Sequence, residues 1–125
     1  SLDAEWNNTT TELDWILIQF AATDCGHCCN GAEAMSNLHA QYSENVTFFT
    51  FIINFSWSDS DLDEIAAFQD EADVFGCNDD NNNCMDRPGE PHNWTYVDDR
   101  NWYWFSAFHM QGTPSYVIVA PNGVV

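Results

Sequence analysis

Apolar residues follow one another along this chain in two patterns, continuous runs and helical spacings. The runs Trp15–Ala21 and Val46–Phe55 predict buried strands, because strands that are covered on both faces carry few polar residues. A shorter run over residues 115–120 predicts a third strand. Residues 26–43 place apolar side chains three and four positions apart, which predicts an amphipathic helix.

Two further helices are predicted between the second and third strands. One begins at the polar run 58–61, which is rich in good N-capping residues, and continues to about Val74. The other covers residues 101–109. Between them, residues 76–93 are rich in Asn, Asp, Gly and Pro and show no periodicity, so we expect a long insertion loop there.

The two ends of the sequence are predicted to be less regular. Residues 1–13 are polar and are expected to form an extended lead-in. Pro121-Asn122-Gly123 predicts a hairpin turn into a last strand that begins at Val124. We expect a C-terminal helix that would cover one sheet face to be missing, so that the sequence is a trimmed fragment.

The order of these elements predicts an α/β fold in a single domain over residues 1–125. Strands separated by helices pair in parallel through right-handed crossovers, and the final hairpin adds an antiparallel pair. The expected architecture is a central mixed sheet flanked by helices, with an Asn/Asp-rich insertion. At 125 residues, of which 45% are hydrophobic, the chain can form one core.

The formal charge of the chain is strongly negative. Twenty Asp and Glu residues oppose only two basic residues, Arg87 and Arg100, which gives a net charge of -18. This balance argues against nucleic acid and anionic lipid as partners, since both bind through cationic side chains. An acidic surface of this kind is either simply solvated or suited to high salt, where screening removes most self-repulsion.

Five cysteines in so short a chain are many for a reducing compartment. Cys25 and Cys28 form a Cys-x-x-Cys pair directly after a predicted strand and at the start of a predicted helix. The free N–H groups and the dipole of a helix N-terminus stabilise a thiolate, and a lowered thiol pKa makes a cysteine nucleophilic. The pair is therefore predicted to be redox-active, with a structural disulfide as the alternative. Zinc is disfavoured, because the spacing of Cys77 and Cys84 is poor for a second ligand pair.

Two segments of the chain resemble the thioredoxin superfamily. Residues 16–28 resemble its strand and its active-site motif, which here ends in Cys-Gly-His-Cys, and residues 112–115 (Gly-Thr-Pro-Ser) resemble its cis-proline loop. The long insertion and the helix before Gly112 are similar to the TlpA-like branch of extracytoplasmic thioredoxins. The resemblance covers residues 14–125 and implies a thioredoxin-like fold with thiol–disulfide oxidoreductase activity.

The resemblance also implies a role for individual residues of the two motifs. Cys25 would be the attacking thiol, and Cys28 would be the resolving thiol. Pro114 would be cis and would face this pair. Backbone groups of Thr113 would pair with an extended substrate as an added strand.

Residues beside the two cysteines modify the chemistry that the resemblance implies. Gly26 and His27 are similar to the pair found between the cysteines of protein disulfide isomerases, and a protonated His27 would stabilise the thiolate. Asp24 stands where the family often has tryptophan, and its carboxylate would raise the pKa of Cys25. Gln19 stands at the position of the family's buried aspartate and cannot accept a proton.

The other cysteines and polar or aromatic clusters are expected to be structural. Cys77 and Cys84 are predicted to form a disulfide, which a loop-entropy model values at roughly 2–3 kcal/mol. Cys29 is expected to be a small buried helix residue, with a redox role as the alternative. The run 79–83 is expected to be a solvated loop rather than a calcium site, because it lacks the EF-hand spacing. The aromatic residues over 94–108 are expected to close the core rather than to line a peptide groove.

The predicted function is thiol–disulfide exchange with protein substrates outside the cytoplasm. It needs an upstream redox partner, and no metal or cofactor is expected; a membrane tether would lie outside this sequence. The alternative is a copper-binding metallochaperone, because Cys25 and Cys29 resemble the ligand spacing of Sco-type thioredoxin-fold proteins. Those proteins add a histidine at the position that Thr113 occupies here, which argues against copper.

Overall fold

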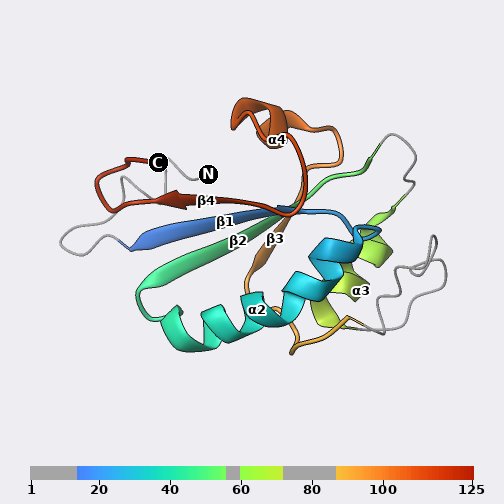
Figure 1. Cartoon of the computed structure of the whole chain (residues 1–125), viewed down its shortest axis with the longest axis horizontal. Helices are drawn as coiled ribbons and strands as arrows, with labels where there is room; N and C mark the ends of the chain where they lie inside the picture. The colour runs from blue at the N-terminus through green and yellow to red at the C-terminus, as the bar shows by residue number, and fades with distance from the viewer. Residues whose placement is uncertain (1–13, 56–59, 72–86) are drawn as a thin grey trace.

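A computed structural model of the chain describes residues 14–55, 60–71 and 87–125. In these ranges a mixed sheet of four strands, in the order β3-β2-β1-β4, carries α2 and α3 on one side and α4 on the other (Figure 1). The elements are β1 (Trp15–Ala21), α2 (Gly26–Tyr42), β2 (Val46–Ile52), α3 (Leu62–Asp70), β3 (Thr95–Asp98), α4 (Tyr103–Ala107) and β4 (Ser115–Val119). None of the helices in the described ranges is long and apolar enough to cross a membrane.

The strand pairing confirms the mixed sheet. β1 pairs in parallel with β2, and β2 pairs in parallel with β3. β4 runs antiparallel to β1, with Ile16 opposite Val119 and Phe20 opposite Ser115. The rule that strands separated by helices pair in parallel therefore fails for β4. The reason is that the chain enters β4 at the edge of the sheet where β1 ends.

Two helices end earlier than the apolar spacing predicts. Asp61 caps α3 by accepting a hydrogen bond of 2.9 Å from the N–H of Glu64, but the helix stops at Asp70 because Glu71 adopts a left-handed conformation (φ 58°). α4 covers only 103–107 of the predicted 101–109. Left-handed residues outside its two ends interrupt the helical dihedrals.

β3 is an element that the hydrophobic pattern did not predict. It has only four residues and lies directly after the predicted insertion loop 76–93. The polar residues around β3 hide the alternation of a strand in the sequence. The segment is a strand because it pairs with β2. The predicted last strand is not formed either: Gly123 donates to Ala120 in the expected turn, but residues 124 and 125 are not in a strand. The lead-in 1–13 and residues 76–86 lie outside the described ranges.

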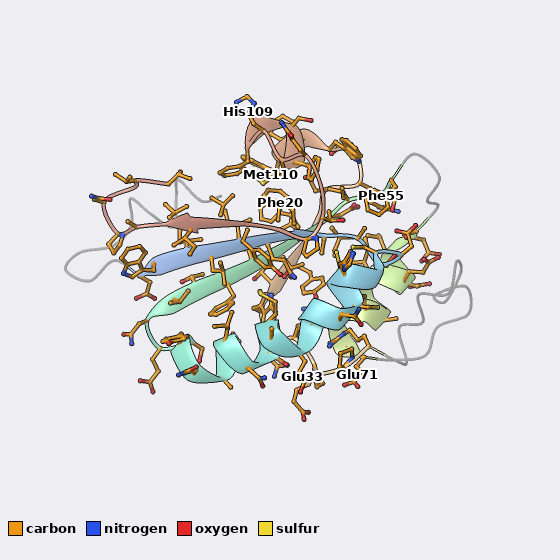
Figure 2. All side chains as sticks on the ribbon, viewed as in Figure 1. Phe20, Glu33, Phe55, Glu71, His109 and Met110 are labelled. Carbon is orange, nitrogen blue, oxygen red and sulfur yellow. The ribbon has the colours of Figure 1, made fainter. Side chains whose placement is uncertain are left out.

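Alternate residues of each strand face opposite sides of the sheet, as the period of a strand requires. On the α4 side, Phe20 lies at the centre of an aromatic cluster with its ring centroid 5.3 Å from that of Phe51 and 5.8 Å from those of Phe105 and Phe108. Figure 2 shows Phe20 beneath the loop that carries Met110. The predicted role of the aromatic segment in closing the core is thus correct for Phe105.

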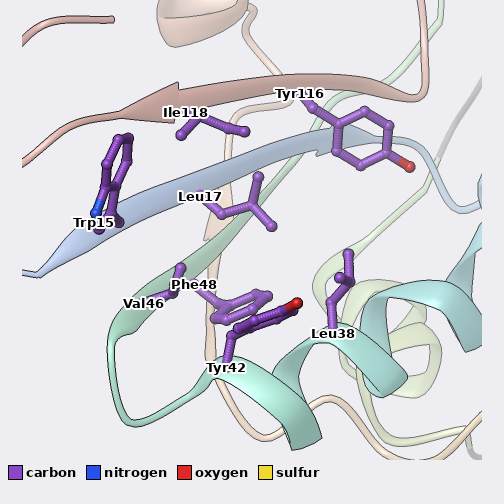
Figure 3. A pocket seen from close by; sticks show the side chains of 8 residues that line it. All are labelled: Trp15, Leu17, Leu38, Tyr42, Val46, Phe48, Tyr116 and Ile118. Carbon is purple, nitrogen blue, oxygen red and sulfur yellow. The ribbon is translucent and has the colours of Figure 1, made fainter.

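On the α2 side, one part of the sheet is covered by a buried cluster, and the part towards β4 is left open. Leu17, Met35, Phe48 and Trp94 form a buried cluster. Towards β4, however, side chains of β1, β4 and α2 leave an apolar hollow of about 460 Å³ (Figure 3). Its lining residues are Trp15, Leu17, Leu38, Tyr42, Val46, Phe48, Tyr116 and Ile118. Apolar surface of the sheet is therefore exposed between α2 and β4.

Both basic residues of the chain serve internal contacts. Arg87 is fully buried, and its guanidinium donates to the backbone carbonyl groups of Phe68, Gln69, Pro88 and Glu90. The first two of these belong to the last turn of α3, whose carbonyls have no partner within the helix. Arg100 pairs with Asp98 at 2.8 Å and donates to the carbonyl of Ser60. The surface is thus left without a free Lys or Arg charge.

A buried histidine joins α2 to the segment before β3. Nε2 of His92 lies 2.9 Å from the carbonyl oxygen of Ala32, and Nδ1 lies 2.6 Å from the hydroxyl of Tyr96. Because a carbonyl only accepts, Nε2 carries the proton and Tyr96 donates to Nδ1. The ring also stacks on Trp94, with centroids 4.2 Å apart. Burial, and to a smaller extent the nearby charge of Arg87, lower the pKa of His92 to about 4.

We expect this histidine to weaken the fold in mild acid. Between its ordinary pKa of 6.5 and its folded pKa of about 4, the unfolded chain binds a proton that the folded chain excludes. The free energy of unfolding should therefore fall as pH falls through this window, by up to about 3 kcal/mol from His92 alone. Urea unfolding at a series of pH values measures the slope.

The matched variants are His92→Gln and His109→Asn, since His109 is exposed. The first should flatten the dependence on pH between 6.5 and 4, and the second should leave it unchanged. An equal slope in the parent chain and in His92→Gln would contradict the assignment.

Candidate functional site

The two cysteines of the Cys-x-x-Cys motif lie where β1 passes into α2. Cys25 is the N-cap of the helix and has an extended backbone conformation (φ -102°, ψ 112°). The turn before it is held by the N–H of Cys25, which donates to the carbonyl of Ala22, and by a buried contact of 2.6 Å between the hydroxyls of Thr23 and Ser60. Cys25 is 7% exposed and Cys28 is fully buried.

Three donors surround the sulfur of Cys25. The backbone N–H of Cys28 lies 3.2 Å from Sγ, in the position of an N-cap hydrogen bond. The hydroxyl of Thr113 donates to the same sulfur at 3.4 Å. The thiol of Cys28 is the third donor. The Cys25 sulfur is therefore an acceptor that three groups approach, which favours its ionised form.

These donors set the protonation of the pair. The hydrogen bond from the Cys28 side chain lowers the pKa of Cys25 most, burial opposes it, and Thr113 and the N–H groups of Cys28 and His27 lower it again, to about 6. The pKa of Cys28 is raised, because its proton is held by the Cys25 sulfur and because its side chain is buried. At neutral pH the pair is a Cys25 thiolate beside a Cys28 thiol.

The segment before β4 contains Thr113 and Pro114, and it brings Thr113 to this sulfur. The peptide bond between them is cis, as the Gly-Thr-Pro motif predicts. The carbonyl oxygen of Thr113 lies 3.7 Å from Sγ of Cys25, although 88 residues separate the two in sequence. Ser115 donates from its hydroxyl to the carbonyl of Gly112 and closes the turn that precedes the strand. The two sequence motifs therefore meet at one sulfur atom.

The hydroxyl of Thr113 is a functional group that the sequence reasoning missed. The motif pointed to its backbone and to Pro114, but not to its side chain as a donor to Cys25. A hydroxyl residue directly before a proline that opens a strand is the signal that could have suggested it. The antiparallel register of β4 on β1 is what brings it to the sulfur.

Other predicted residues lie around the pair in different environments. Gly26 and His27 are exposed at the first positions of α2; the backbone N–H of His27 contributes to the lowered pKa of Cys25. Asp24 is half-buried, and so is Cys29, which packs against the core. Cys77 and Cys84 lie outside the described ranges.

Gln19 lies buried on β1, on the α2 side of the sheet. Its Oε1 accepts a hydrogen bond of 2.9 Å from the hydroxyl of Thr50, which in turn accepts one of 2.9 Å from the indole N–H of Trp94. The remaining side-chain group of Gln19 is its amide NH₂, and Tyr116 lies opposite Gln19 in the pairing of β1 with β4. The side chain of Gln19 is therefore neutral and has no ionisable proton.

Metal ligands do not converge in the described part of the chain. No three His, Cys, Asp or Glu side chains among those residues lie close enough together to hold a metal ion. The described site is thus a pair of sulfurs with hydroxyl and amide neighbours.

We expect Thr113→Val to make Cys25 less acidic. The valine keeps the shape of the side chain but removes the donated hydrogen bond, so the pKa of Cys25 should rise from about 6 to roughly 7. Thr113→Ser keeps the donor and should titrate like the parent chain. Thiolate absorbance in a pH titration, with Cys28 present, reads the difference. Identical titrations for the valine and serine variants would show that the hydroxyl does not act on the sulfur.

Comparison with known proteins gives structural matches alone. No family model and no curated protein matches the chain. A secreted Mycobacterium tuberculosis disulfide oxidoreductase, homologous to E. coli DsbE, matches with a TM-score of 0.60 and 15% identity over 90% of this chain and 66% of its own. MTB DsbF, solved in mixed oxidised and reduced forms, matches with a TM-score of 0.60 and 16% identity over 90% of this chain and 66% of its own.

A thioredoxin-like protein from Aeropyrum pernix matches with a TM-score of 0.64 and 15% identity, over 94% of this chain and 68% of its own. The chain thus spans about two thirds of the length of these proteins. At such low identity the likeness concerns the backbone arrangement, and it agrees with the mixed sheet and its flanking helices. The chain has a thioredoxin-like fold.

Proposed function

We propose that this protein is a thiol–disulfide oxidoreductase that exchanges disulfides with protein substrates. The observation that carries the proposal is the Cys25 sulfur, which accepts hydrogen bonds from the N–H of Cys28 and the hydroxyl of Thr113 at the start of α2. With a pKa of about 6, Cys25 is mostly thiolate at neutral pH. Thiolate is the form that attacks a disulfide.

The geometry supports a two-step exchange. In the first step the Cys25 thiolate attacks a substrate disulfide, forms a mixed disulfide and releases one substrate thiolate. In the second step Cys28 loses its proton, and its sulfur attacks Cys25, which releases the second substrate thiolate and leaves a Cys25–Cys28 disulfide. Reduction of that disulfide by an upstream dithiol partner returns the pair to the thiol form.

Protein substrates are proposed because of the loop beside Cys25. The turn 112–114 borders the sulfur, and a Cβ built at Gly112 meets no atom within 4 Å, so space is open there. An extended segment that pairs with the backbone of Thr113 would bring its own sulfur to Cys25. The high cysteine content and the match to a secreted disulfide oxidoreductase support a location outside the cytoplasm.

The copper-binding alternative has less support. Copper on Cys25 and Cys29 would need a further soft or imidazole ligand. Thr113 stands at the position expected for that ligand, and its hydroxyl donates to Cys25. We therefore propose exchange chemistry and treat a role for Cys29 as an outcome of the experiment below.

We expect Cys25→Ser to abolish disulfide exchange and Cys29→Ser to keep most of it. Only Cys25 caps the helix and accepts the hydrogen bonds described above, whereas Cys29 lies further along α2. Reduction of insulin with dithiothreitol as electron donor measures the activity of both variants. Equal losses in the two variants would make Cys29 part of the site and would favour copper binding.

We also expect Cys77 and Cys84 to be bonded to each other. The proposal depends on their place at the two sides of an Asn/Asp-rich run, where a disulfide would close a short loop. Mass spectrometry of the alkylated, non-reduced chain should leave both unlabelled and yield one cross-linked peptide. Alkylation at both positions would contradict the disulfide.

A further inference from the structure

The carboxyl ends of the three parallel strands form one edge of the sheet, and the turn that carries Cys25 leaves from this edge. Ala21 of β1 pairs with Ile52 of β2, and Ile52 pairs with Asp98 of β3, so these three residues form a row across the sheet. Because neighbouring strands lie about 4.8 Å apart, the row is about 10 Å long. Ligands of parallel sheets bind beyond such an edge, so a substrate held at Cys25 can extend along it.

A polar hollow of about 400 Å³ lies at the β2 and β3 part of this edge. Its lining residues are Asn54, Ser60, Asp98, Arg100 and Asn101. Ser60 joins the hollow to the reactive site, because its hydroxyl lies 2.6 Å from that of Thr23, which stands two positions before Cys25. The polar hollow therefore adjoins the turn that carries the reactive sulfur.

The ion pair in the polar hollow retains donors and an acceptor for a ligand. Nε and Nη2 of Arg100 donate to the two oxygens of Asp98 at 2.8 and 2.9 Å, and Nη1 donates to the carbonyl of Ser60 at 2.9 Å. Each terminal nitrogen of a guanidinium carries two N–H groups, so one on each has no acceptor among the described residues. Oδ2 of Asp98 keeps a lone pair in the same way. The side chains are 31% and 41% exposed, so a ligand can reach them.

Two amides add further polar groups to the wall of the polar hollow. Oδ1 of Asn101 accepts from the N–H of Tyr103 at 3.2 Å, which leaves the NH₂ group of Asn101 as a donor. Oδ1 of Asn54 is buried and has no hydrogen-bond partner, although buried polar atoms are nearly always paired. The amide of Asn54 has to turn toward the hollow before this oxygen can accept from a ligand. The wall thus contains an acceptor that the fold itself leaves unsatisfied.

This combination of donors and acceptors matches the main chain of a polypeptide. Each residue of an extended segment directs its own N–H and C=O to the same side, so one residue can donate to Asp98 and accept from Arg100. The opposite charges of the pair cancel, which gives no reason to prefer a charged ligand. An extended segment needs about three residues to cover the row from β1 to β3.

We propose that the polar hollow binds the main chain of the polypeptide substrate, about three residues from the cysteine that reacts with Cys25. This inference rests on the proposed function and adds a second point of contact to the loop at Thr113. Because main-chain groups are common to all polypeptides, the contact favours polypeptide disulfides of any sequence. A small disulfide is too short to reach the hollow and gains nothing from it.

The experiment compares a polypeptide disulfide with a small neutral one. Reduced protein is mixed with insulin or with bis(hydroxyethyl) disulfide, and alkylation of quenched samples followed by mass spectrometry measures the fraction of oxidised chains. Asn101→Asp removes the amide donor and keeps an oxygen for the N–H of Tyr103. It should slow oxidation by insulin about three- to tenfold at low insulin concentration, as the loss of one hydrogen bond does. The rate with the small disulfide should not change.

Arg100→Met is the second variant, since it removes every donor of the guanidinium. It should slow oxidation by insulin at least as much as Asn101→Asp does. This variant also loses the hydrogen bond to Ser60, and the small disulfide detects any resulting displacement of the turn that carries Cys25. An unchanged rate with the small disulfide therefore assigns the loss to binding of the polypeptide.

Asn122→Asp is the matched control. Asn122 is exposed, its Oδ1 accepts from the backbone N–H of Val124, and the change adds the same negative charge outside the polar hollow. It should leave both rates unchanged. Parental rates with insulin in both hollow variants, equal slowing with the two disulfides, or an equal effect of Asn122→Asp would overturn the proposal. A parent chain that neither disulfide oxidises would instead refute the proposed function, so the two failures are distinguishable.

Discussion

The hydrogen bonds from Cys28 to the sulfur of Cys25 are the interaction on which the site depends. Both the N–H and the thiol of Cys28 approach the same sulfur, so one residue caps the helix and holds its neighbour as a thiolate. The fold maintains this arrangement because Cys28 is enclosed between α2 and the sheet. The burial of Cys28 raises its own pKa, and the hydrogen bonds that Cys28 donates lower the pKa of Cys25.

The buried polar groups beneath α2 are joined without using a carboxylate. Trp94 donates to Thr50 and Thr50 donates to Gln19, and each donor has one acceptor. This neutral series of hydrogen bonds gives the buried polar atoms their partners without burying a charge. The one fully buried carboxylate among the described residues, Asp99, lies elsewhere and accepts hydrogen bonds from the backbone N–H groups of Trp104 and Phe105.

Both basic residues of the chain are engaged in contacts within the fold. Arg87 donates hydrogen bonds to carbonyl groups at the end of α3. Arg100 forms an ion pair with Asp98 and donates a hydrogen bond to the carbonyl of Ser60. A chain with a formal charge of -18 will repel acidic partners at low salt and will lose that selectivity as salt rises.

The sequence by itself determined the local features: the strand before Cys25, the helix after it and the N-cap position of Cys25. These depend on residues within one or two turns, so apolar spacing and capping preferences are sufficient to identify them. Tertiary structure alone decided that β3 forms, that β4 runs antiparallel to β1 and that the hydroxyl of Thr113 reaches Cys25. Such contacts join residues far apart in sequence, and they depend on strand register and packing, which no local pattern encodes.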